Sequence, residues 1–203
     1  MATAGDACVA WATDLARRDG EDAIETSCPA SNTQKVAWLS RHGFQCFGDP
    51  YLFQALQLTK SVPEREVPSD YRVCALNWDA VGLSVTGGEP FPRWEYDAMR
   101  RAPGYRPDLD VKAYCDDTVV AGCICWLDAI DRSGELEPVG THAGHRRMGL
   151  AAACTARALN ALRGHGARWG CVRVAADNLP AVRLYQSLGF RTVDEDLGWR
   201  LRL

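Results

Sequence analysis

The chain has 203 residues, of which 47% are apolar and 24% are charged, a composition typical of a globular protein with one full hydrophobic core and a smaller unit. Its formal net charge of −3 and the lack of any block of Lys or Arg argue against nucleic acid as the main partner. No apolar run approaches the length that spans a membrane, and acidic residues within the first 20 positions argue against a signal peptide, so we expect a cytoplasmic protein without a membrane partner.

The first third of the chain alternates between helical and extended patterns. Residues 4–18 and 32–42 are predicted to form helices, and residues 22–28 and Tyr51–Ser61 are predicted to form strands. The segment Val62–Ser69 carries two prolines and charges of both signs, so we interpret it as a linker. A boundary after residue 66 then separates residues 1–66 from a larger domain over residues 67–203.

The larger domain is predicted to alternate strands and helices. In chain order we expect a strand over Tyr71–Leu76, helical stretches between residues 78 and 105 of which 93–101 is the clearest, a hairpin of Asp110–Cys115 and Thr118–Trp126, a strand over Glu135–Thr141, a helix over 147–164, a strand over 168–175, a helix over 178–188, and an antiparallel pair of Arg191–Asp196 with Gly198–Leu203.

The turn before the predicted helix at 147–164 has the features of an anion-binding site. It reads Arg146, Arg147, Met148, Gly149, Leu150, Ala151. A helix that begins there points unpaired backbone N–H groups and the positive end of its dipole at whatever fills the turn. Gly149 lacks a Cβ atom, which lets a phosphate oxygen approach the backbone, and the two arginines add charge and forked donors. The turn is therefore predicted to hold a pyrophosphate.

A second motif follows about 30 residues later, after the predicted strand at 168–175. Asn178 is a plausible N-cap of the next helix, Pro180 suits its first turn, and Gly189 suits its C-terminal end.

These two motifs in this order resemble the GNAT superfamily of acetyl-CoA-dependent N-acetyltransferases, and the resemblance runs from about Tyr71 to Leu203. The chain has Ala151 where the family usually has Gly, and Ala143 where a Pro is frequent. The resemblance implies an α/β fold with a mixed sheet that splays near Val139, flanked by helices, and acetyl-CoA as co-substrate. The cofactor-binding residues it implies are Val139, Thr141, Arg146, Arg147, Met148, Gly149, Leu150, Ala151 and Asn178.

Part of the second motif also occurs near the N-terminus, at an offset of 146 positions. Asn32, Val36, Gly43 and Phe44 match Asn178, Val182, Gly189 and Phe190, as Gly20 matches Gly166 and Cys8 matches Cys154. Residues 1–66 thus look like the C-terminal half of a second domain of the same fold, as in tandem-domain members of the superfamily. This half lacks the pyrophosphate turn and has Leu39 in place of Tyr185, so we expect it to be structural, and a homodimer is a possible assembly.

Two residues are candidates for the chemistry of acetyl transfer. A lysine-type amine has a pKa of about 10.4 and must lose a proton before it attacks. Glu137 could accept that proton directly or through a water, as a Glu on this strand does in related acetyltransferases; Glu135 is the alternative because it is expected on the same face. Tyr185 is protonated at neutral pH and could protonate the leaving thiolate. The alternative interpretations are that both glutamates are solvated or bind an amine substrate without taking its proton, and that Tyr185 is a core tyrosine with its hydroxyl at the surface.

The nine cysteines are an odd number and include no C-x-x-C pair. Cys123 and Cys125 alternate along a predicted strand, and zinc would need two further ligands at a suitable spacing, so we expect no metal and reduced thiols.

The resulting expectation is an N-acetyltransferase that acts on a primary amine of a small molecule or peptide. A non-catalytic protein that binds or senses acyl-CoA is the alternative. A tandem enzyme acting on an unusual acceptor such as an amino-sugar thiol conjugate, and a phosphate-binding protein unrelated to CoA, are further possibilities.

Overall fold

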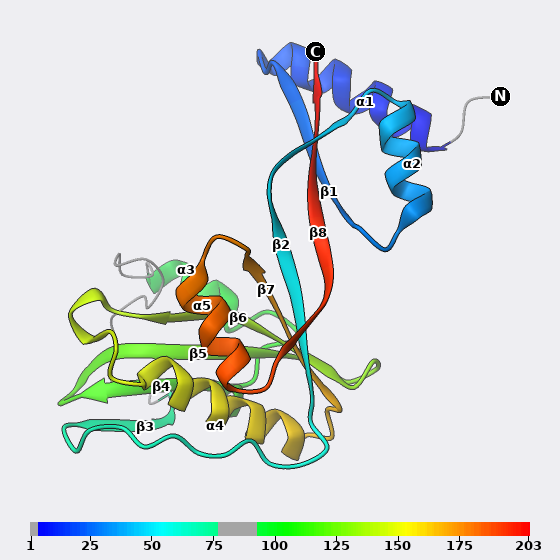
Figure 1. Ribbon diagram of the computed structural model, residues 1–203. Helices are drawn as coiled ribbons and strands as arrows, with labels where there is room; N and C mark the ends of the chain where they lie inside the picture. The colour runs from blue at the N-terminus through cyan, green and yellow to red at the C-terminus, as the bar shows by residue number, and fades with distance from the viewer. Residues whose placement is uncertain (1–3, 77–92) are drawn as a thin grey trace. The chain divides into compact units, whose positions relative to one another are not determined.

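The computed structural model describes residues 4–76 and 93–203, and Figure 1 shows the elements along the chain. The helices are α1 (Ala4–Asp19), α2 (Thr33–Arg41), α3 (Arg93–Met99), α4 (Leu150–Gly164) and α5 (Leu179–Ser187), with 3-10 turns η1 (Pro107–Leu109) and η2 (Ala143–His145). The strands are β1 (Ala23–Pro29), β2 (Gln45–Gln57), β3 (Tyr71–Ala75), β4 (Asp110–Cys115), β5 (Thr118–Asp128), β6 (Ser133–Thr141), β7 (Trp169–Ala175) and β8 (Arg191–Arg202). The helical stretches expected between residues 78 and 92 lie outside the described residues.

The strands form one mixed sheet in the order β1-β8-β2-β7-β6-β5-β4-β3. The pairs β3–β4, β4–β5 and β5–β6 are antiparallel, whereas β6 and β7 run parallel. This confirms the expected mixed α/β architecture.

The chain forms two compact units, and neither is a continuous stretch. The central unit comprises Gln54–Val172 and Pro180–Arg191. The terminal unit comprises Met1–Phe53, Arg173–Leu179 and Thr192–Leu203. The boundary after residue 66 stays a prediction.

The core of the central unit lies between α4 and the sheet (Figure 1). Leu159 and Leu162 are fully buried on the sheet side of α4. Two glycines let this helix come close: a Cβ atom on Gly134 would lie 2.5 Å from Leu162, and one on Gly170 would lie 2.6 Å from Leu159. Small residues on β6 and β7 thus set the height of α4 above the strands.

The terminal unit has its own small core. Strands β1 and β8 pair antiparallel from Ala23 with Arg202 to Pro29 with Asp196. A cluster of four buried side chains covers this pair: Cys28, Leu39, Phe44 and Trp199. Leu39, the counterpart of Tyr185 in the internal match, is therefore a core residue.

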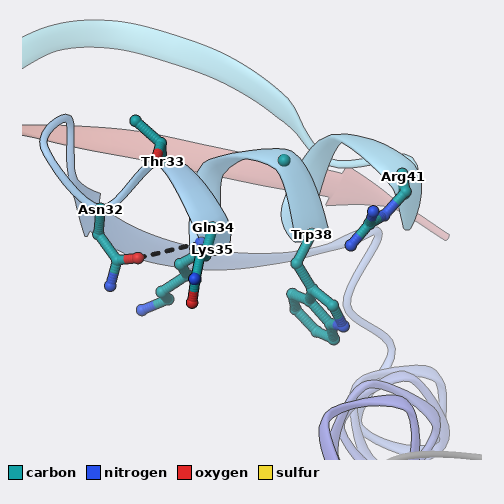
Figure 2. A pocket seen from close by; sticks show the side chains of 7 residues that line it. Asn32, Thr33, Gln34, Lys35, Trp38 and Arg41 are labelled. Atoms are coloured by element: carbon teal, nitrogen blue, oxygen red, sulfur yellow. Dashed lines mark hydrogen bonds between the residues drawn. The ribbon is translucent and has the colours of Figure 1, made fainter.

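Helix α2 begins with the expected cap. The side chain of Asn32 accepts a hydrogen bond from the Lys35 amide at 3.0 Å, as Figure 2 shows. The same side chains and those of Trp38 and Arg41 line a surface depression along the helix. The residue that follows this helix, His42, is tied to Asp6 of α1 by a hydrogen bond of 2.7 Å between its Nε2 and the carboxylate.

One predicted turn is wrong. The pair expected at 191–196 and 198–203 is a single strand, β8, and Gly198 lies within it opposite Ser27. A Cβ atom on Gly198 would lie 2.9 Å from the Phe47 carbonyl oxygen. Glycine is needed here for a close backbone approach rather than for a turn.

Two other element bounds also differ from the prediction. Strand β2 begins at Gln45 rather than at Tyr51. Gly48 and Pro50 suggest a turn in the sequence, but both lie inside the strand. Helix α4 begins at Leu150 rather than at residue 147, because Gly149 adopts a left-handed conformation that ends the turn before it.

The secondary structure of residues 4–57 recurs 146 positions later. At that offset the bounds of β1 coincide with those of β7, and the bounds of α2 coincide with those of α5. Helix α1 and strand β2 begin where α4 and β8 begin. The matched glycines also share a positive φ: Gly20 (78°) with Gly166 (85°), and Gly43 (81°) with Gly189 (98°).

Candidate active site

The strand β6 carries three of the predicted site residues. Its recorded pairing with β7 runs from Ser133–Trp169 to Glu135–Cys171. Glu137, Val139 and Thr141 come after these pairs, where β6 continues along β5 toward the turn at 142–149.

A bulge interrupts β6 at Glu137. Leu136 pairs with Cys125 and Val139 with Cys123, so Glu137 and Pro138 together stand opposite one residue of β5. Such a bulge bends its strand and changes where side chains point. Strict alternation therefore stops at this position: Val139 and Thr141 share a sheet face with Leu136.

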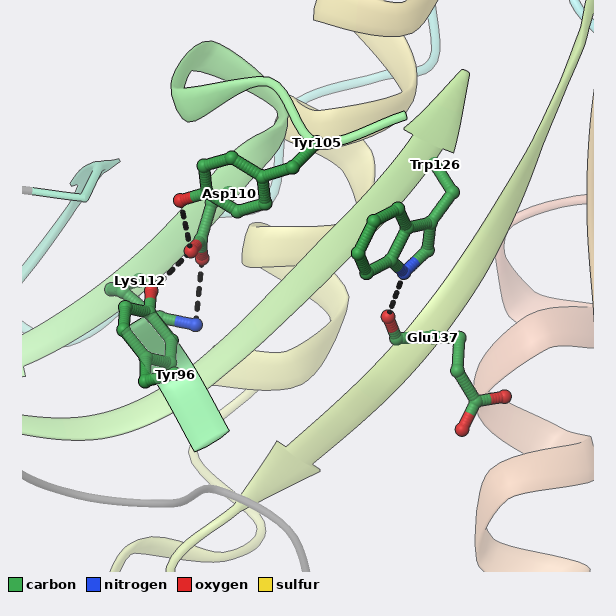
Figure 3. Close-up of polar contacts among 6 residues, drawn as sticks. All are labelled: Tyr96, Tyr105, Asp110, Lys112, Trp126 and Glu137. Carbon is green, nitrogen blue, oxygen red and sulfur yellow. Dashed lines mark hydrogen bonds and ion pairs between the residues drawn. The ribbon is translucent and has the colours of Figure 1, made fainter. Parts of the chain in front are cut away.

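The charge of Glu137 acts on the protonation of Tyr185. Tyr185 is a buried residue of α5, and its ring packs on Phe190 at a centroid distance of 5.7 Å. Burial raises the pKa of the Tyr185 phenol well above its usual value, and the Cys123 thiol and the Glu137 carboxylate raise it further. In Figure 3 the Glu137 carboxylate points toward α5. The phenol is thus held protonated.

Glu135 has different surroundings. It pairs with Trp126 on β5 and with Cys171 on β7. The pKa of the Cys171 thiol is raised by burial and then by the charge of Glu135. Of the two glutamates on β6, only Glu137 contributes to the raised pKa of Tyr185.

The turn at 142–149 presents a helix N-terminus to solvent. Arg147 and Gly149 both have positive φ, at 67° and 76°, and Gly149 is the N-cap of α4 without a side-chain cap bond. The first amide bonded within the helix is that of Ala153, which donates to the Gly149 carbonyl at 3.0 Å. The amides of the first helical turn therefore point out of the helix, and this arrangement suits an anion.

The side chains of the turn divide into exposed and anchored ones. Arg146, Arg147 and Met148 are exposed, whereas Leu150 is buried against the core. Ala151 is half-buried. Two arginines are thus presented beside the outward-pointing amides, while Leu150 fixes the start of α4.

Histidines brace the same turn. His142 caps η2 by accepting from the Gly144 amide, and His145 shares a hydrogen bond of 2.9 Å between its Nδ1 and the Tyr71 hydroxyl. The rings of Tyr71 and His145 meet edge to face at 5.8 Å. These contacts give His145 a structural partner on β3.

Replacing Gly149 by Val tests the turn. Val is a steric outlier at positive φ, so the outward amides should be displaced. Each amide or dipole contact to an anion is worth about 0.3–1 kcal/mol, and the loss of several should weaken the binding of CoA expected from the sequence roughly ten- to hundredfold in calorimetry. Gly149→Asn is the matched comparison: it adds the same Cβ atom where a phosphate oxygen would approach but tolerates this conformation, so it should lose less affinity than the Val variant. A Cβ atom there would lie 3.7 Å from the Glu66 carbonyl, so no clash is expected. Wild-type affinity of the Val variant would show that CoA binds elsewhere.

A polar cluster beside β6 was not predicted from the sequence (Figure 3). The Trp126 indole donates to the Glu137 carbonyl at 2.7 Å. Nearby, Asp110 is fully buried and forms an ion pair of 2.7 Å with Lys112. Two signals in the sequence could have found it: Pro138 within a strand pattern, which indicates a bulge, and two charged residues alternating on the strand at 110–115.

The remaining predicted residue, Asn178, belongs to the terminal unit. It directly precedes α5, and its amide donates to the Ala175 carbonyl at 3.0 Å.

In the parts of the chain that the structure describes, no helix combines the length and apolarity needed to span a membrane.

The cysteines divide into buried and more accessible ones. All nine cysteines are free, but only Cys28, Cys123, Cys125 and Cys154 are buried. Within residues 4–76 and 93–203, no group of three or more His, Cys, Asp or Glu side chains is arranged to hold a metal ion.

Comparison with known sequences identifies a family and two relatives. A family model described as "Acetyltransferase (GNAT) family" matches residues 72–190. A protein named mycothiol acetyltransferase from Kineococcus radiotolerans is 35% identical over 124 residues, which are 59% of this chain and 40% of that protein. One of the same name from Corynebacterium kroppenstedtii is 34% identical over 192 residues, which are 95% of this chain and 45% of that protein. The chain thus spans less than half the length of these curated relatives.

Solved structures share the fold at low sequence identity. A GCN5-related N-acetyltransferase from Sphaerobacter thermophilus matches with a TM-score of 0.77 and 20% identity, covering 98% of this chain and 67% of that one. A tandem GNAT protein from the clavulanic acid biosynthesis pathway matches with a TM-score of 0.74 and 19% identity, covering 100% of this chain and 71% of that one.

Proposed function

We propose, from the premise that this chain belongs to the acetyltransferase (GNAT) family, that it transfers the acetyl group of acetyl-CoA directly to a primary amine, with Glu137 as the base and Tyr185 as the acid. One observation carries the assignment of these roles. The Glu137 carboxylate points toward α5, the helix of Tyr185 (Figure 3), and its charge contributes to the raised pKa of this buried phenol. A proton acceptor on β6, the strand that leads into the turn at 142–149, is thus proposed to work with a proton donor on α5.

The proposed reaction conserves protons. The acceptor amine gives a proton to Glu137, directly or through a water, and attacks the thioester carbonyl. The carbon–sulfur bond then breaks, and the thiolate takes the proton of Tyr185. The new amide nitrogen gives its surplus proton to the Tyr185 phenolate, and Glu137 returns its proton to solvent. The raised pKa keeps this phenol protonated until the thiolate forms.

The turn and the end of β6 are proposed to hold the acetyl-CoA. The outward amides of α4, from Leu150 and Ala151, and the exposed Arg146 and Arg147 supply donors and charge for the pyrophosphate. Met148 and Gly149 complete that turn.

The acyl arm is proposed to lie along Val139 and Thr141, beyond the last recorded pairs between β6 and β7. Asn178 is proposed to contact the pantetheine arm.

The acceptor is proposed to be a small amine. Two curated relatives are named mycothiol acetyltransferase, which makes mycothiol in its non-acetylated amine form the first acceptor to test. A homodimer and a cytoplasmic location stay predictions.

The decisive experiment measures thiol release from acetyl-CoA with a panel of amines that includes this one, amino acids, aminoglycosides, polyamines and peptides. Steady release with one acceptor supports the proposed function. CoA binding without turnover on any amine would favour the non-catalytic acyl-CoA-binding or sensing protein.

Replacing Tyr185 by Phe tests the acid. Because its pKa is raised, the phenol stays protonated through the measurable alkaline range, so it cannot give rise to the basic limb of the pH–rate profile. The variant should therefore lower turnover at every pH without moving that limb. The deficit should shrink with acyl donors whose thiols are better leaving groups. An equal deficit for all donors would contradict proton donation to sulfur.

Residues 1–66 are proposed to be a degenerate, structural half of a second domain of this family. The recurrence of element bounds and positive-φ glycines at an offset of 146 supports this proposal. Residues 67–203 would then form the complete acetyltransferase domain.

A further inference from the structure

The bulge that carries Glu137 is held by a side chain from the neighbouring strand. Glu137 and Pro138 stand opposite a single residue of β5, and Pro138 has no N–H to give to the ladder. The indole Nε1 of Trp126 donates to the Glu137 carbonyl at 2.7 Å. The peptide that follows Glu137 is thereby fixed by a directed hydrogen bond in the part of the strand where the regular register is broken.

Trp126 is in turn held on its other side. Its ring meets that of Tyr105 at a centroid distance of 6.2 Å and an interplanar angle of 67°, an edge-to-face arrangement. A Cβ atom on Gly104 would lie 3.5 Å from the Trp126 ring, so the backbone there also packs against the indole. The indole plane is therefore set by the segment before η1.

That segment is anchored by a buried ion pair. The Tyr105 hydroxyl donates to an oxygen of Asp110 at 2.9 Å, and Tyr96 of α3 donates to the same oxygen. The other oxygen of Asp110 contacts Lys112 at 2.7 Å, and both charged side chains are buried. Gly122 leaves the space that Lys112 fills, because a Cβ atom there would lie 2.8 Å from the lysine chain.

This cluster has the features of a rigid support. Burial, and then the charge of Asp110, raise the pKa of both Tyr96 and Tyr105, so both hydroxyls remain donors. Hydrogen bonds to a charged acceptor are stronger than neutral ones, so the two tyrosine bonds to one Asp110 oxygen hold Tyr96 and Tyr105 in place. Movement of Tyr105 would leave part of the Asp110 charge unsatisfied.

We propose that Trp126 is a positioning residue, which aims the Glu137 carboxylate through its bond to the bulge carbonyl and is itself held by Tyr105 and Asp110 (Figure 3). This inference rests on the proposed role of Glu137 as the base. Small displacements of a catalytic group are costly because proton transfer needs close alignment of donor and acceptor.

The test is a double-mutant cycle of Trp126→Phe and Glu137→Gln, read out as turnover and as KM for acetyl-CoA. Phe keeps an aromatic ring but cannot donate to the carbonyl. In the wild-type background, Trp126→Phe should lower kcat about three- to tenfold, the amount typical of one hydrogen bond, and leave KM for acetyl-CoA unchanged. In the Glu137→Gln background it should have no further effect, because the group that it positions no longer takes a proton.

Several results would overturn the inference. A wild-type kcat for Trp126→Phe would do so, as would an equal loss in both backgrounds, which would mean that Trp126 acts elsewhere. Trp11→Phe, at an exposed position of α1, is the matched control and should leave kcat unchanged. If Trp126→Phe fails to fold, Tyr105→Phe, which keeps the ring on Trp126 but loses its anchor, is measured in the same cycle. Full activity of Glu137→Gln alone would instead reject the proposed base.

Discussion

Replacing Glu137 by Gln should lower turnover by about 10²–10⁴-fold at neutral pH, while acetyl-CoA binds as it does to the wild type. Gln has the same shape and keeps the bulge, but it cannot accept a proton. The acceptor amine, with a pKa of about 10.4 for a lysine-type group, is almost fully protonated at neutral pH and needs a base. The deficit should therefore shrink as the pH rises toward the pKa of the amine. Steady-state thiol release between pH 6 and 10 gives this profile.

Glu135→Gln is the matched control for this experiment. It makes the same chemical change two residues away on β6, at a side chain whose charge acts on Cys171 rather than on Tyr185. We expect it to retain most of the activity. If the two variants lose activity equally, or if Glu135→Gln loses more, the assignment of the base to Glu137 is wrong.

Deleting residues 1–66 should produce a fragment that aggregates, even though every proposed catalytic residue remains. Strand β8 lies between β1 and β2 in the sheet, so the deletion removes both of its neighbours. It also uncovers Trp199, which is 6% exposed in the full chain. A long strand with two free edges and an exposed aromatic side chain pairs readily with other chains. Light scattering and solution mass of the 67–203 fragment check this prediction, and a soluble, fully active fragment would contradict it.

A point variant separates the two causes of that instability. Trp199→Ala in the full chain empties the terminal core but keeps β1 and β2 beside β8. It should cost about 3–5 kcal/mol of stability by denaturant unfolding, the usual range for a buried aromatic residue. We expect this variant to remain monodisperse at low temperature, since no strand edge is uncovered. Aggregation as severe as that of the fragment would show that the core, rather than the edges, controls association.

Much of the fold was predictable because its signals are local. Asn32 caps α2 and Gly43 follows it at positive φ, as their residue types indicate. The prediction of a turn at Gly198 was wrong for a physical reason, because glycine occurs both in turns and where two backbones approach closely. Only the neighbouring Phe47 carbonyl distinguishes these two cases. The same ambiguity hid the start of β2.

The site was predictable only in part for a similar reason. The turn before α4 and the two acid–base candidates carry recognisable residue types at recognisable positions. The bulge at Glu137 depends on the register with β5, and the support of Trp126 depends on Tyr105 and Asp110, which meet it only in the folded chain. Contacts of this kind leave no periodic pattern in one sequence.

The position of β8 between β1 and β2 also bears on how the protein is made. The paired residues Ala23 and Arg202 are 179 positions apart (202 − 23). At typical rates of synthesis, β1 leaves the ribosome on the order of ten to forty seconds before its partner. During this interval β1 and β2 lack β8, the strand that lies between them in the sheet. Pairings this distant in sequence also form slowly. The terminal unit is therefore exposed to misassembly until β8 has been made, at a stage when the central unit already has all of its strands.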